Sequence, residues 1–454
     1  MHSVTKRLQI GKKNSPSIKD LEKIVKILYP IPRSILGKGF RESLQLLQDQ
    51  IGIPFKWNYV NSGTQVLDWI VPQEWLIKDA YILDPMGKKI ADFKKNNLHL
   101  VNYSCAVDKT ISLTELKKHL HTLPLMPNDI PYVTSYYNRT WGFCISHNEF
   151  EKLKEGKYKV FIDSDHIDGS LVYGELALPG KTKKEILITS YLCHPKMANH
   201  ELGGPVALCY LYKMLKASGP HKYTYRFLIC PENIGAAAFL HKSGKDVGNV
   251  IEAGFILNCL AYGNEWVLKK SREGNLLSDL LARNTLTSSD LPQKVIDYFP
   301  DGSDERQFCS PGYNWPVSLV MRKMYGTFPE YHTSADSLDF INYETLAESI
   351  NMHFKMMMAA ELNFVPLGKV QKGSPMLSRS PICLYPKVMN YVTQPKSEST
   401  RVILSILNMS DGKSSLLEIA ERYNFSLIEF SDIVEKLCYS KYIEEYNSKT
   451  LNNI

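Results

Sequence analysis

The second half of the chain alternates short apolar runs with longer amphipathic stretches. The run at residues 185–193 is largely apolar, as expected for a strand that is buried on both faces of a sheet. Between such runs, apolar residues recur every three or four positions, which indicates helices that pack one side against that sheet. This order predicts an α/β fold with a mostly parallel central sheet flanked by helices. The predicted strands are residues 185–193, 223–230, 254–260 and 317–321, and the predicted helices are residues 203–217, 234–241, 276–286 and 343–362.

Residues 55–173 show a different pattern. Short β-like runs are separated by Gly, Pro and Asp-Pro turn signals, with one helical stretch among them. We therefore expect a small, mostly-β domain inserted before the α/β region. Residues 17–50, which precede it, have helical spacing with a turn at Pro30. The β-like runs are residues 65–71, 79–83, 99–105 and 157–162, and the helical stretch is residues 113–120.

The C-terminal part is set apart by prolines and lysines after residue 365, which are typical of a linker. Beyond them, three short helical patterns and a strand edge predict a winged helix. Ser415 and Ser426 are candidate caps of two of its helices. The predicted parts are an N-terminal helical part of the main domain (1–54), the inserted mostly-β domain (55–173), the main α/β domain (174–364), the linker (365–395) and the winged-helix-like domain (396–454).

Composition narrows the class of protein. A chain of 454 residues, 44% hydrophobic and 22% charged, exceeds the ~250–300 residues at which single cores stop growing, so we expect two or three domains. No apolar run approaches the ~18 residues of a membrane span, and no signal peptide is visible. The nine cysteines are scattered without a C-x-x-C pair, which argues against a disulfide framework. We therefore predict a cytoplasmic protein without a membrane partner.

Metal-capable side chains follow three of the apolar runs. His194 comes directly after the first predicted strand, and His200 with Glu201 precedes the next helix. Glu232 follows the second strand, and His332 lies beyond residues 317–321. The carboxyl ends of parallel strands meet at one edge of a sheet, where imidazoles and carboxylates from several elements can share one metal ion.

Each of these residues also has an ordinary structural interpretation. A single loop histidine is usually structural, while Glu201 and Glu232 could favour or cap a helix N-terminus. However, burying several imidazoles and a carboxylate together without a cation carries a large desolvation cost. Their joint occurrence therefore favours a metal site.

The order of these motifs resembles the co-catalytic zinc aminopeptidase superfamily. More closely, the chain resembles bacterial aminopeptidase-like proteins of polysaccharide-biosynthesis clusters, which combine that fold with an inserted β domain and a C-terminal winged helix. The matching stretches cover nearly the whole chain in order. They are Ser62-Gly63-Thr64 through Asp68-Trp69, Pro72-Gln73-Glu74-Trp75, Ile130-Pro131-Tyr132 through Trp141-Gly142-Phe143-Cys144, Cys193-His194-Pro195, Pro231-Glu232-Asn233-Ile234-Gly235, Gly302-Ser303-Asp304-Glu305-Arg306-Gln307 and Tyr331-His332-Thr333-Ser334-Ala335-Asp336.

The resemblance implies a metal-dependent hydrolase, and this sequence departs from it at three points. His200 stands where the superfamily has a bridging aspartate, and an imidazole cannot hold two cations through two oxygens. The second-metal aspartate falls near Asn258 or Cys259, and Pro231 replaces the usual general base. These departures favour one ion, predicted to be zinc. Its predicted ligands are His200, Glu232 and His332, with His194 either a fourth ligand or the remnant of a second site.

With three protein ligands, zinc keeps one position for a water that attacks an amide carbonyl. A further group must carry protons, and the candidates are Glu201, Asp304 and Glu305, of which Glu201 is favoured by its closeness to His200 in sequence. The forked donors of an arginine suit a substrate carboxylate. The candidate substrate-binding residues are Arg306, Arg322 and Tyr331.

Three functions compete at this point. The leading one is a zinc-dependent, aminopeptidase-like hydrolase that acts on a peptide or an N-acylated small molecule, in surface-polysaccharide biosynthesis. The second is a non-catalytic descendant that keeps a metal or ligand site, because His200, Asn258 and Pro231 depart from the family pattern. The least favoured is a DNA-binding regulator, since residues 387–454 carry eight Lys and Arg against nine Asp and Glu. We instead expect the tail to contact protein, within the chain or in a homo-oligomer.

Overall fold

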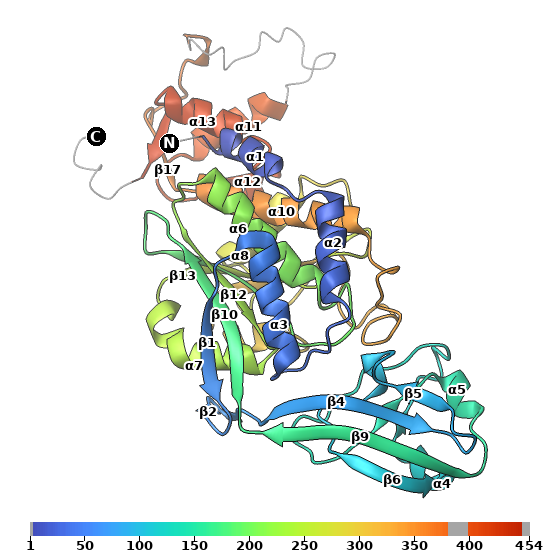
Figure 1. The fold of residues 1–454 in the computed structure, drawn as a ribbon. Coiled ribbons are helices and arrows are strands. Elements are labelled where there is room, and N and C mark those ends of the chain that lie inside the picture. The colour runs from blue at the N-terminus through green and yellow to red at the C-terminus, as the bar shows by residue number, and fades with distance from the viewer. Residues whose placement is uncertain (1–2, 380–397, 447–454) are drawn as a thin grey trace.

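The computed structural model describes residues 3–379 and 398–446. Its main domain is built on an eight-stranded mixed sheet (Figure 1). The four central strands are parallel to one another, whereas the strands on either side of them run antiparallel to their central neighbours. The strands, in spatial order, are β1 (Lys56–Asn61), β10 (Ser170–Leu178), β12 (Thr224–Cys230), β11 (Glu185–Tyr191), β13 (Ile251–Ile256), β16 (Val317–Met321), β14 (Trp266–Lys269) and β15 (Gln293–Ile296).

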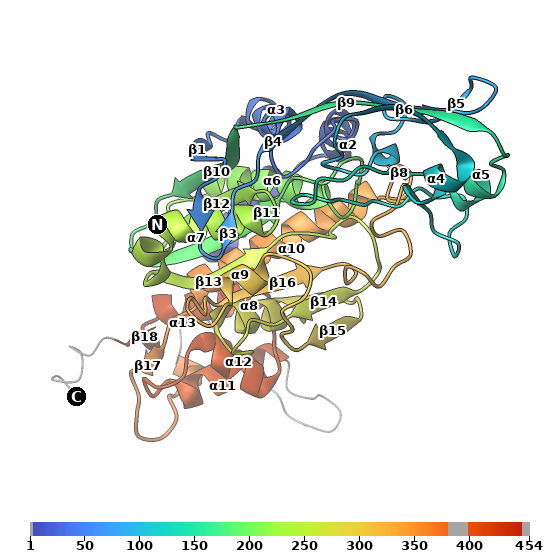
Figure 2. The same cartoon turned by 90° about the horizontal axis from the view of Figure 1, so that it is seen from below.

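Helices cover both faces of this sheet (Figure 2). Successive residues of β11 show why, because Ile186 and Ile188 pack into one core and Leu187 into the other. Burial on both faces also explains why the central strands consist mostly of consecutive apolar residues. One face carries α1 (Val4–Lys13), α2 (Ile18–Leu28), α3 (Lys38–Leu47) with the π-helical turn Gln48–Gly52, α6 (Gly203–Ser218), α8 (Leu277–Leu286) and α10 (Tyr343–Leu362), and the other carries α7 (Ile234–Gly248) and α9 (Glu305–Phe308).

The predicted α/β fold is confirmed, with differences in detail. Residues 17–50 form two helices that are separated at Pro30, as the turn signal indicated. Residues 99–105 are not a strand; Leu100 and Asn102 make only isolated bridges. The pattern did not reveal α1, β14 or β15, because their apolar residues are few or their strands are short.

The inserted domain is an antiparallel four-stranded sheet with short additions. The long strands β4 and β9 extend away from the main domain (Figure 1). Strands β1 and β10 lie in the main sheet, so we propose that the insertion begins after β1 and ends before β10, inside the predicted limits of 55 and 173. The elements are β5 (Lys89–Asp92), β4 (Glu74–Leu83), β9 (Lys157–Ile167) and β6 (Val107–Ser112), the pairs β2 (Gln65–Val66) with β3 (Trp69–Ile70) and β7 (Leu120–His121) with β8 (Phe143–Cys144), and helices α4 (Leu113–Lys117), α5 (His147–Glu151) and the 3-10 turn Asn97–His99.

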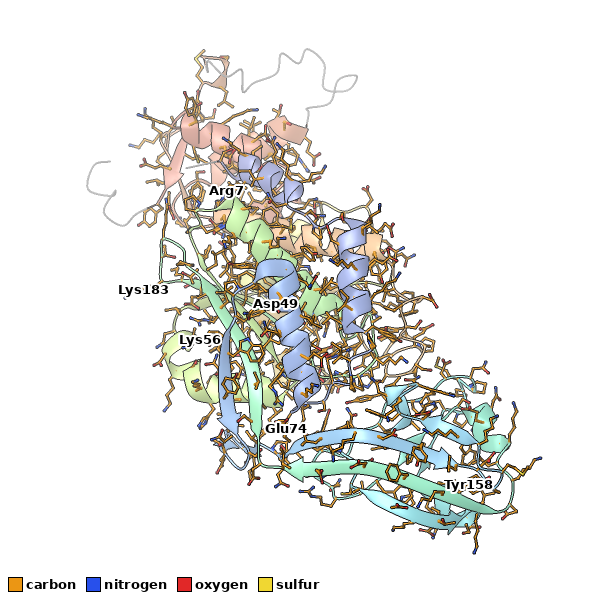
Figure 3. All side chains as sticks on the ribbon, viewed as in Figure 1. Arg7, Asp49, Lys56, Glu74, Tyr158 and Lys183 are labelled. Carbon is orange, nitrogen blue, oxygen red and sulfur yellow. The ribbon has the colours of Figure 1, made fainter. Side chains whose placement is uncertain are left out.

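Glu74 fixes the junction between the two sheets (Figure 3). Its two carboxylate oxygens accept hydrogen bonds from Arg41 of α3 at 2.6 and 2.9 Å. Gly169, at the other crossing between the sheets, lies so close to the Glu74 side chain that a Cβ there would overlap it. A bidentate arginine–carboxylate pair of this kind fixes direction as well as distance.

The C-terminal domain contains three helices and a two-stranded antiparallel wing, as predicted for a winged helix. Ser415 caps α12 in a capping box with Glu418. Ser426 does not cap α13, which begins five residues later at Ser431. The first wing strand lies inside the predicted linker, of which residues 380–395 are outside the described residues. The elements are α11 (Glu398–Met409), α12 (Leu416–Tyr423), α13 (Ser431–Tyr439), β17 (Pro366–Gly368) and β18 (Ile443–Glu445), with a 3-10 turn at Leu377–Arg379.

This domain packs against the main domain of the same chain. Arg283 of α8 forms an ion pair with Glu421 of α12 at 2.5 Å. Glu435 of α13 accepts hydrogen bonds from the backbone and the hydroxyl of Thr5 in α1, at 3.2 and 2.8 Å. The expected protein contact is therefore found within the chain, while assembly into a homo-oligomer stays a prediction. Within residues 3–379 and 398–446, no helix is long and apolar enough to cross a membrane.

The first turn of α6 packs against the sheet through Gly204, and we expect a larger residue there to destabilise the fold. A Cβ on Gly204 would overlap the backbone oxygen of Leu257 and the hydroxyl of Ser190, whereas a Cβ on Gly203 would find its nearest neighbour, on Ala261, at 3.7 Å. Gly204→Ala should therefore lower the free energy of unfolding by about 1–3 kcal/mol, the usual range for overpacking. Gly203→Ala, measured by the same denaturant titration, should leave it unchanged or higher; equal effects of both variants would contradict this packing.

Candidate metal centre

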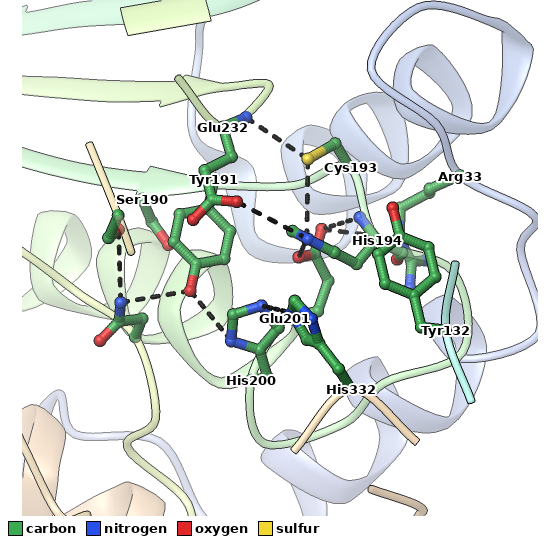
Figure 4. Close-up of polar contacts among 12 residues, drawn as sticks. Arg33, Tyr132, Ser190, Tyr191, Cys193, His194, His200, Glu201, Glu232 and His332 are labelled. Atoms are coloured by element: carbon green, nitrogen blue, oxygen red, sulfur yellow. Dashed lines mark hydrogen bonds and ion pairs between the residues drawn. The ribbon is translucent and has the colours of Figure 1, made fainter. Parts of the chain in front are cut away.

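Three histidines from separate segments meet at the carboxyl edge of the central strands (Figure 4). His194 follows β11, His200 lies in the loop before α6, and His332 lies between β16 and α10. One ring nitrogen from each lies within 4.8 Å of one from each of the others, and the Nε2 atoms of His200 and His332 are 3.1 Å apart. Glu232, which follows β12, places Oε2 3.7 Å from His194 Nε2. Residues that are far apart in the chain therefore share one site.

The backbone is strained around this site. Asn233, Cys259 and His332 have positive φ values of 60°, 48° and 57°, which side chains other than glycine rarely adopt. Such residues persist only when their surroundings hold them in place, and they often gather at functional sites.

Glu201 orients His194. Its Oε2 accepts a hydrogen bond from His194 Nδ1 at 2.7 Å, and its Oε1 accepts one from the His194 backbone N–H at 2.8 Å. The buried Arg33 lies 4.0 Å from Glu201 and donates to the His194 carbonyl at 2.9 Å. A carboxylate oxygen only accepts, so Nδ1 carries the proton and the Nε2 lone pair faces the centre. This is the arrangement that carboxylate–histidine–metal sites use.

His200 is held by a chain of neutral groups and by its own backbone. Its Nδ1 lies 3.1 Å from the Tyr191 hydroxyl, which accepts a hydrogen bond from Asn258 Nδ2 at 3.2 Å. The Asp336 carboxylate accepts from the backbone N–H groups of Asn199 and His200 at 2.6 and 2.9 Å. These contacts fix Nε2 of His200 toward His332.

His332 lies between two aromatic rings. Tyr331 stacks on it with ring centroids 4.0 Å apart, and Tyr132 of the inserted domain meets it edge-on at 5.3 Å. The backbone N–H of Tyr132 also donates to the His332 carbonyl at 2.9 Å. Pro131 forms a β-bridge with Thr333 in the same place. The inserted domain therefore supplies one wall of the centre.

Burial shapes the charges of these groups. It lowers the pKa of His332 to about 3 and that of His200 well below its ordinary value, with nearby His194 adding to both effects. Burial also raises the pKa of Glu232 well above its ordinary value and that of Asp304 to about 7. The neighbouring carboxylates raise the pKa of Glu232 further. The imidazoles of His200 and His332 therefore stay neutral at pH 7.

This donor set fits a zinc ion. Neutral imidazoles offer lone pairs, and two nitrogens bound tetrahedrally to one zinc at ~2.05 Å lie about 3.3 Å apart. The 3.1 Å between the Nε2 atoms of His200 and His332 is close to that separation. The carboxylates near Glu232 disfavour its charged form, and a bound cation would offset that repulsion.

A family model described as a domain of unknown function (DUF4910) matches residues 22–363, and a winged helix-turn-helix model matches residues 367–445. A Clostridium acetobutylicum protein, named as a candidate polysaccharide biosynthesis protein with an aminopeptidase-like domain, is 40% identical over 420 residues, which cover 92% of this chain and 94% of that one. The chain belongs to this aminopeptidase-like family.

Solved structures agree with the family. A crystal structure of a candidate peptidase from C. acetobutylicum covers 98% of this chain and 99% of its own, with 36% identity and a TM-score of 0.85. A zinc aminopeptidase from Bacillus subtilis, with 12% identity and a TM-score of 0.55, covers 76% of this chain and 95% of its own. A peptidase M28 precursor from Shewanella amazonensis, also 12% identical, reaches 0.56 over 79% of this chain and 96% of its own. These two distant structures show that the fold is shared.

The other residues predicted for the site lie in different surroundings. In this aminopeptidase-like chain Asp304 is fully buried and accepts from the Asn233 N–H at 2.5 Å. Glu305 is paired with the buried Lys269 at 2.6 Å, so it is not free to carry protons. Arg322 donates to Glu348 and to a backbone carbonyl, each at 3.0 Å, so its fork is already used. Tyr331 lies at the centre, stacked on His332, and Arg306 is hydrogen-bonded to Asn233, the residue after Glu232.

Sequence reasoning missed residues that support the ligands. Tyr191, the last residue of β11, and Arg33, in the turn after α2, gave no chemical signal because a buried tyrosine or a turn arginine is common. Tyr132 and Asp336 lie within stretches that resemble the family, but their roles depend on contacts with distant segments.

We expect Glu201→Gln to weaken zinc binding about 10- to 100-fold, the usual effect of losing an outer partner of a ligand histidine. The substitution keeps the size of the side chain but removes the negative charge that orients His194 Nδ1. Competition with a fluorescent zinc chelator would measure the dissociation constant. The exposed Glu42→Gln is the control, and an unchanged constant in Glu201→Gln would remove Glu201 from this role.

Proposed function

We propose that this protein is a zinc-dependent hydrolase of peptide or amide bonds that acts in surface-polysaccharide biosynthesis. The convergence of His194, His200 and His332 on one point, with Glu232 beside them, is the observation that carries the proposal. The aminopeptidase-like fold and the name of the 40% identical relative support it. A peptide or an N-acylated sugar is the proposed substrate, and the cytoplasm stays the predicted location.

One zinc ion held by the three imidazoles is the proposed cofactor. This assignment moves His194 into the ligand set, because one ring nitrogen of each of the three histidines lies within 4.8 Å of the others, and it keeps Glu232 free for another role. The neutral pair Tyr191 and Asn258, hydrogen-bonded to each other behind His200, supports a single ion. A second divalent cation would need an anionic ligand at the position of Asn258.

When bound, zinc acidifies water and polarises the amide carbonyl. Glu232 is the proposed proton carrier, which takes a proton from the attacking water and delivers it to the leaving nitrogen. Its side chain is 17% exposed, whereas the side chain of Glu201 is fully buried against His194 and that of Glu305 against Lys269. Tyr132 and Tyr331 help to exclude bulk water from the histidines.

A non-catalytic, metal- or ligand-binding descendant is the second candidate. Pro231 occupies the place of the usual general base and Asn258 that of the second-metal acid, so the chain could have kept a pocket without turnover. DNA binding stays the least favoured function, because Glu435 of α13 contacts α1 in the same chain and residues 387–454 carry an excess of acids.

Zinc content and hydrolysis would be measured on protein purified without chelators. We expect about one equivalent of zinc and release of amine from at least one member of a panel of aminoacyl and N-acetyl-sugar amides. Glu232→Gln should keep the zinc and lower kcat/KM at least about 100-fold. Zinc without any turnover favours the binding descendant, and less than about a tenth of an equivalent contradicts the hydrolase.

A further inference from the structure

Arg306 is held at one edge and open at the other. Its Nε donates to the side-chain oxygen of Asn233 at 2.6 Å. Its Nη1 and Nη2 atoms donate no hydrogen bond to residues 3–379 and 398–446 and form no ion pair with them. The side chain is partly exposed, so this edge can receive a ligand.

Asn233, which holds Arg306, is itself fixed in place and is adjacent in sequence to Glu232, the proposed proton carrier. Asn233 directly follows Glu232, so their Cα atoms are about 3.8 Å apart. Asn233 is strained at φ 60°, and its backbone N–H donates to Asp304 at 2.5 Å while its side chain holds Arg306. A residue in this conformation needs such contacts to persist. The open guanidinium edge is therefore held beside Asn233, the residue after Glu232.

Within the part of the chain that the structure describes, Arg306 is a cation near Glu232 that keeps unpartnered donors on a partly exposed side chain. Arg33 faces Glu201, and the nearby Lys269 is paired with Glu305. The positive charge of Arg306 opposes the burial that raises the pKa values of Glu232 and Asp304. A single fork beside these acids suits a monoanion, because a group of higher negative charge would be repelled by the carboxylates.

We propose that the Nη1–Nη2 edge of Arg306 binds a carboxylate of the substrate. The protein would then select amides that carry an acidic group near the bond to be cleaved. The role of this site in substrate selection rests on the proposed hydrolase function. Carboxylate binding to Arg306 can be tested without hydrolysis. The carboxylate could belong to an amino acid or to an acidic sugar, since both offer two coplanar oxygens to the fork.

Titration calorimetry with matched pairs of ligands tests the carboxylate site. One pair is N-acetylalanine and N-acetylalaninamide, and the other is N-acetylglucosaminuronate and N-acetylglucosamine. In at least one pair, the carboxylate member should bind wild type at least about tenfold more tightly, as expected for a charge-assisted, bidentate contact. The pair that shows the preference identifies the source of the carboxylate.

Arg306→Gln should reduce that preference to less than about twofold, in line with the loss of the charged fork. Arg272→Gln is the control, because the Arg272 side chain is exposed and donates to the side chain of Asn314. Zinc content would be measured in each variant to show that the centre is intact. Equal binding within both pairs in wild type, or a preference that survives in Arg306→Gln, would overturn the inference.

Failure of this site is distinguishable from failure of the proposed function. Zinc binding and hydrolysis without any carboxylate preference would leave the hydrolase in place and remove the role of Arg306. A carboxylate preference that Arg306→Gln abolishes, in a protein without turnover, would support the site and contradict the hydrolase.

Discussion

In His332→Ala, the zinc content should fall from about one equivalent per chain to below about a tenth, and amide hydrolysis should fall to background. His332 supplies one of three imidazoles, and its Nε2 lies 3.1 Å from that of His200. Removing it leaves two histidine ligands, too few for a stable zinc site of this kind. Mass spectrometry under native conditions and elemental analysis would measure the loss.

Two further variants make this result specific. His147→Ala removes a histidine at the start of α5, far from the centre in the sequence, and should keep the full zinc content. His332→Gly removes the same imidazole but relieves the positive φ of 57°, so a folding defect in the alanine variant cannot be mistaken for metal loss. Full zinc occupancy in both His332 variants would contradict the proposed ligand set.

The largest loss of stability is expected for Glu361→Ala. Glu361, near the end of α10, forms an ion pair with Arg7 of α1 at 3.0 Å, and both side chains are at least 96% buried. Its carboxylate also accepts from the backbone N–H of Lys222 at 2.7 Å and the Tyr225 hydroxyl at 3.0 Å. The alanine variant leaves the Arg7 guanidinium buried without its counter-charge, which should lower the free energy of unfolding by about 3–5 kcal/mol.

Urea titration would measure this loss, with a surface pair as the control. Glu22 and Lys26 form an exposed ion pair on α2 at 2.5 Å, and Glu22→Ala should change the free energy of unfolding by less than about 0.5 kcal/mol. The double variant Arg7→Met with Glu361→Leu should recover much of the stability that Glu361→Ala loses, because it removes both charges. A loss below about 1 kcal/mol in Glu361→Ala would contradict this account.

Much of the α/β fold could be predicted because its strands are buried on both faces. The apolar run from Glu185 to Tyr191 reports that burial directly, and amphipathic spacing revealed α6 and α10. Edge strands gave weaker signals. In β15 (Gln293–Ile296) three of the four residues are exposed, so the sequence lacks the apolar pattern of a strand.

The helix caps also differ in whether nearby residues or distant contacts determine them. Ser415 and Glu418 form their capping box locally, so the sequence predicted that helix start. The start of α13 could not be predicted from Ser426. The side chain of Asn284 from α8 accepts the Leu427 N–H at 2.8 Å and donates to the Phe425 carbonyl at 2.8 Å. These contacts from a distant helix engage the backbone around Ser426, and α13 begins at Ser431.

The sequence by itself determined the α/β framework, the inserted and C-terminal parts, and the candidate metal residues. These features depend on the spacing of apolar residues and on the residues that follow each strand, which are close together in the chain. Only the tertiary structure decided what each acid does. Glu201 orients His194, Glu305 pairs with Lys269, and Glu232 keeps an exposed edge. A carboxylate takes its role from the charges and donors around it, and here those come from segments far away in the chain.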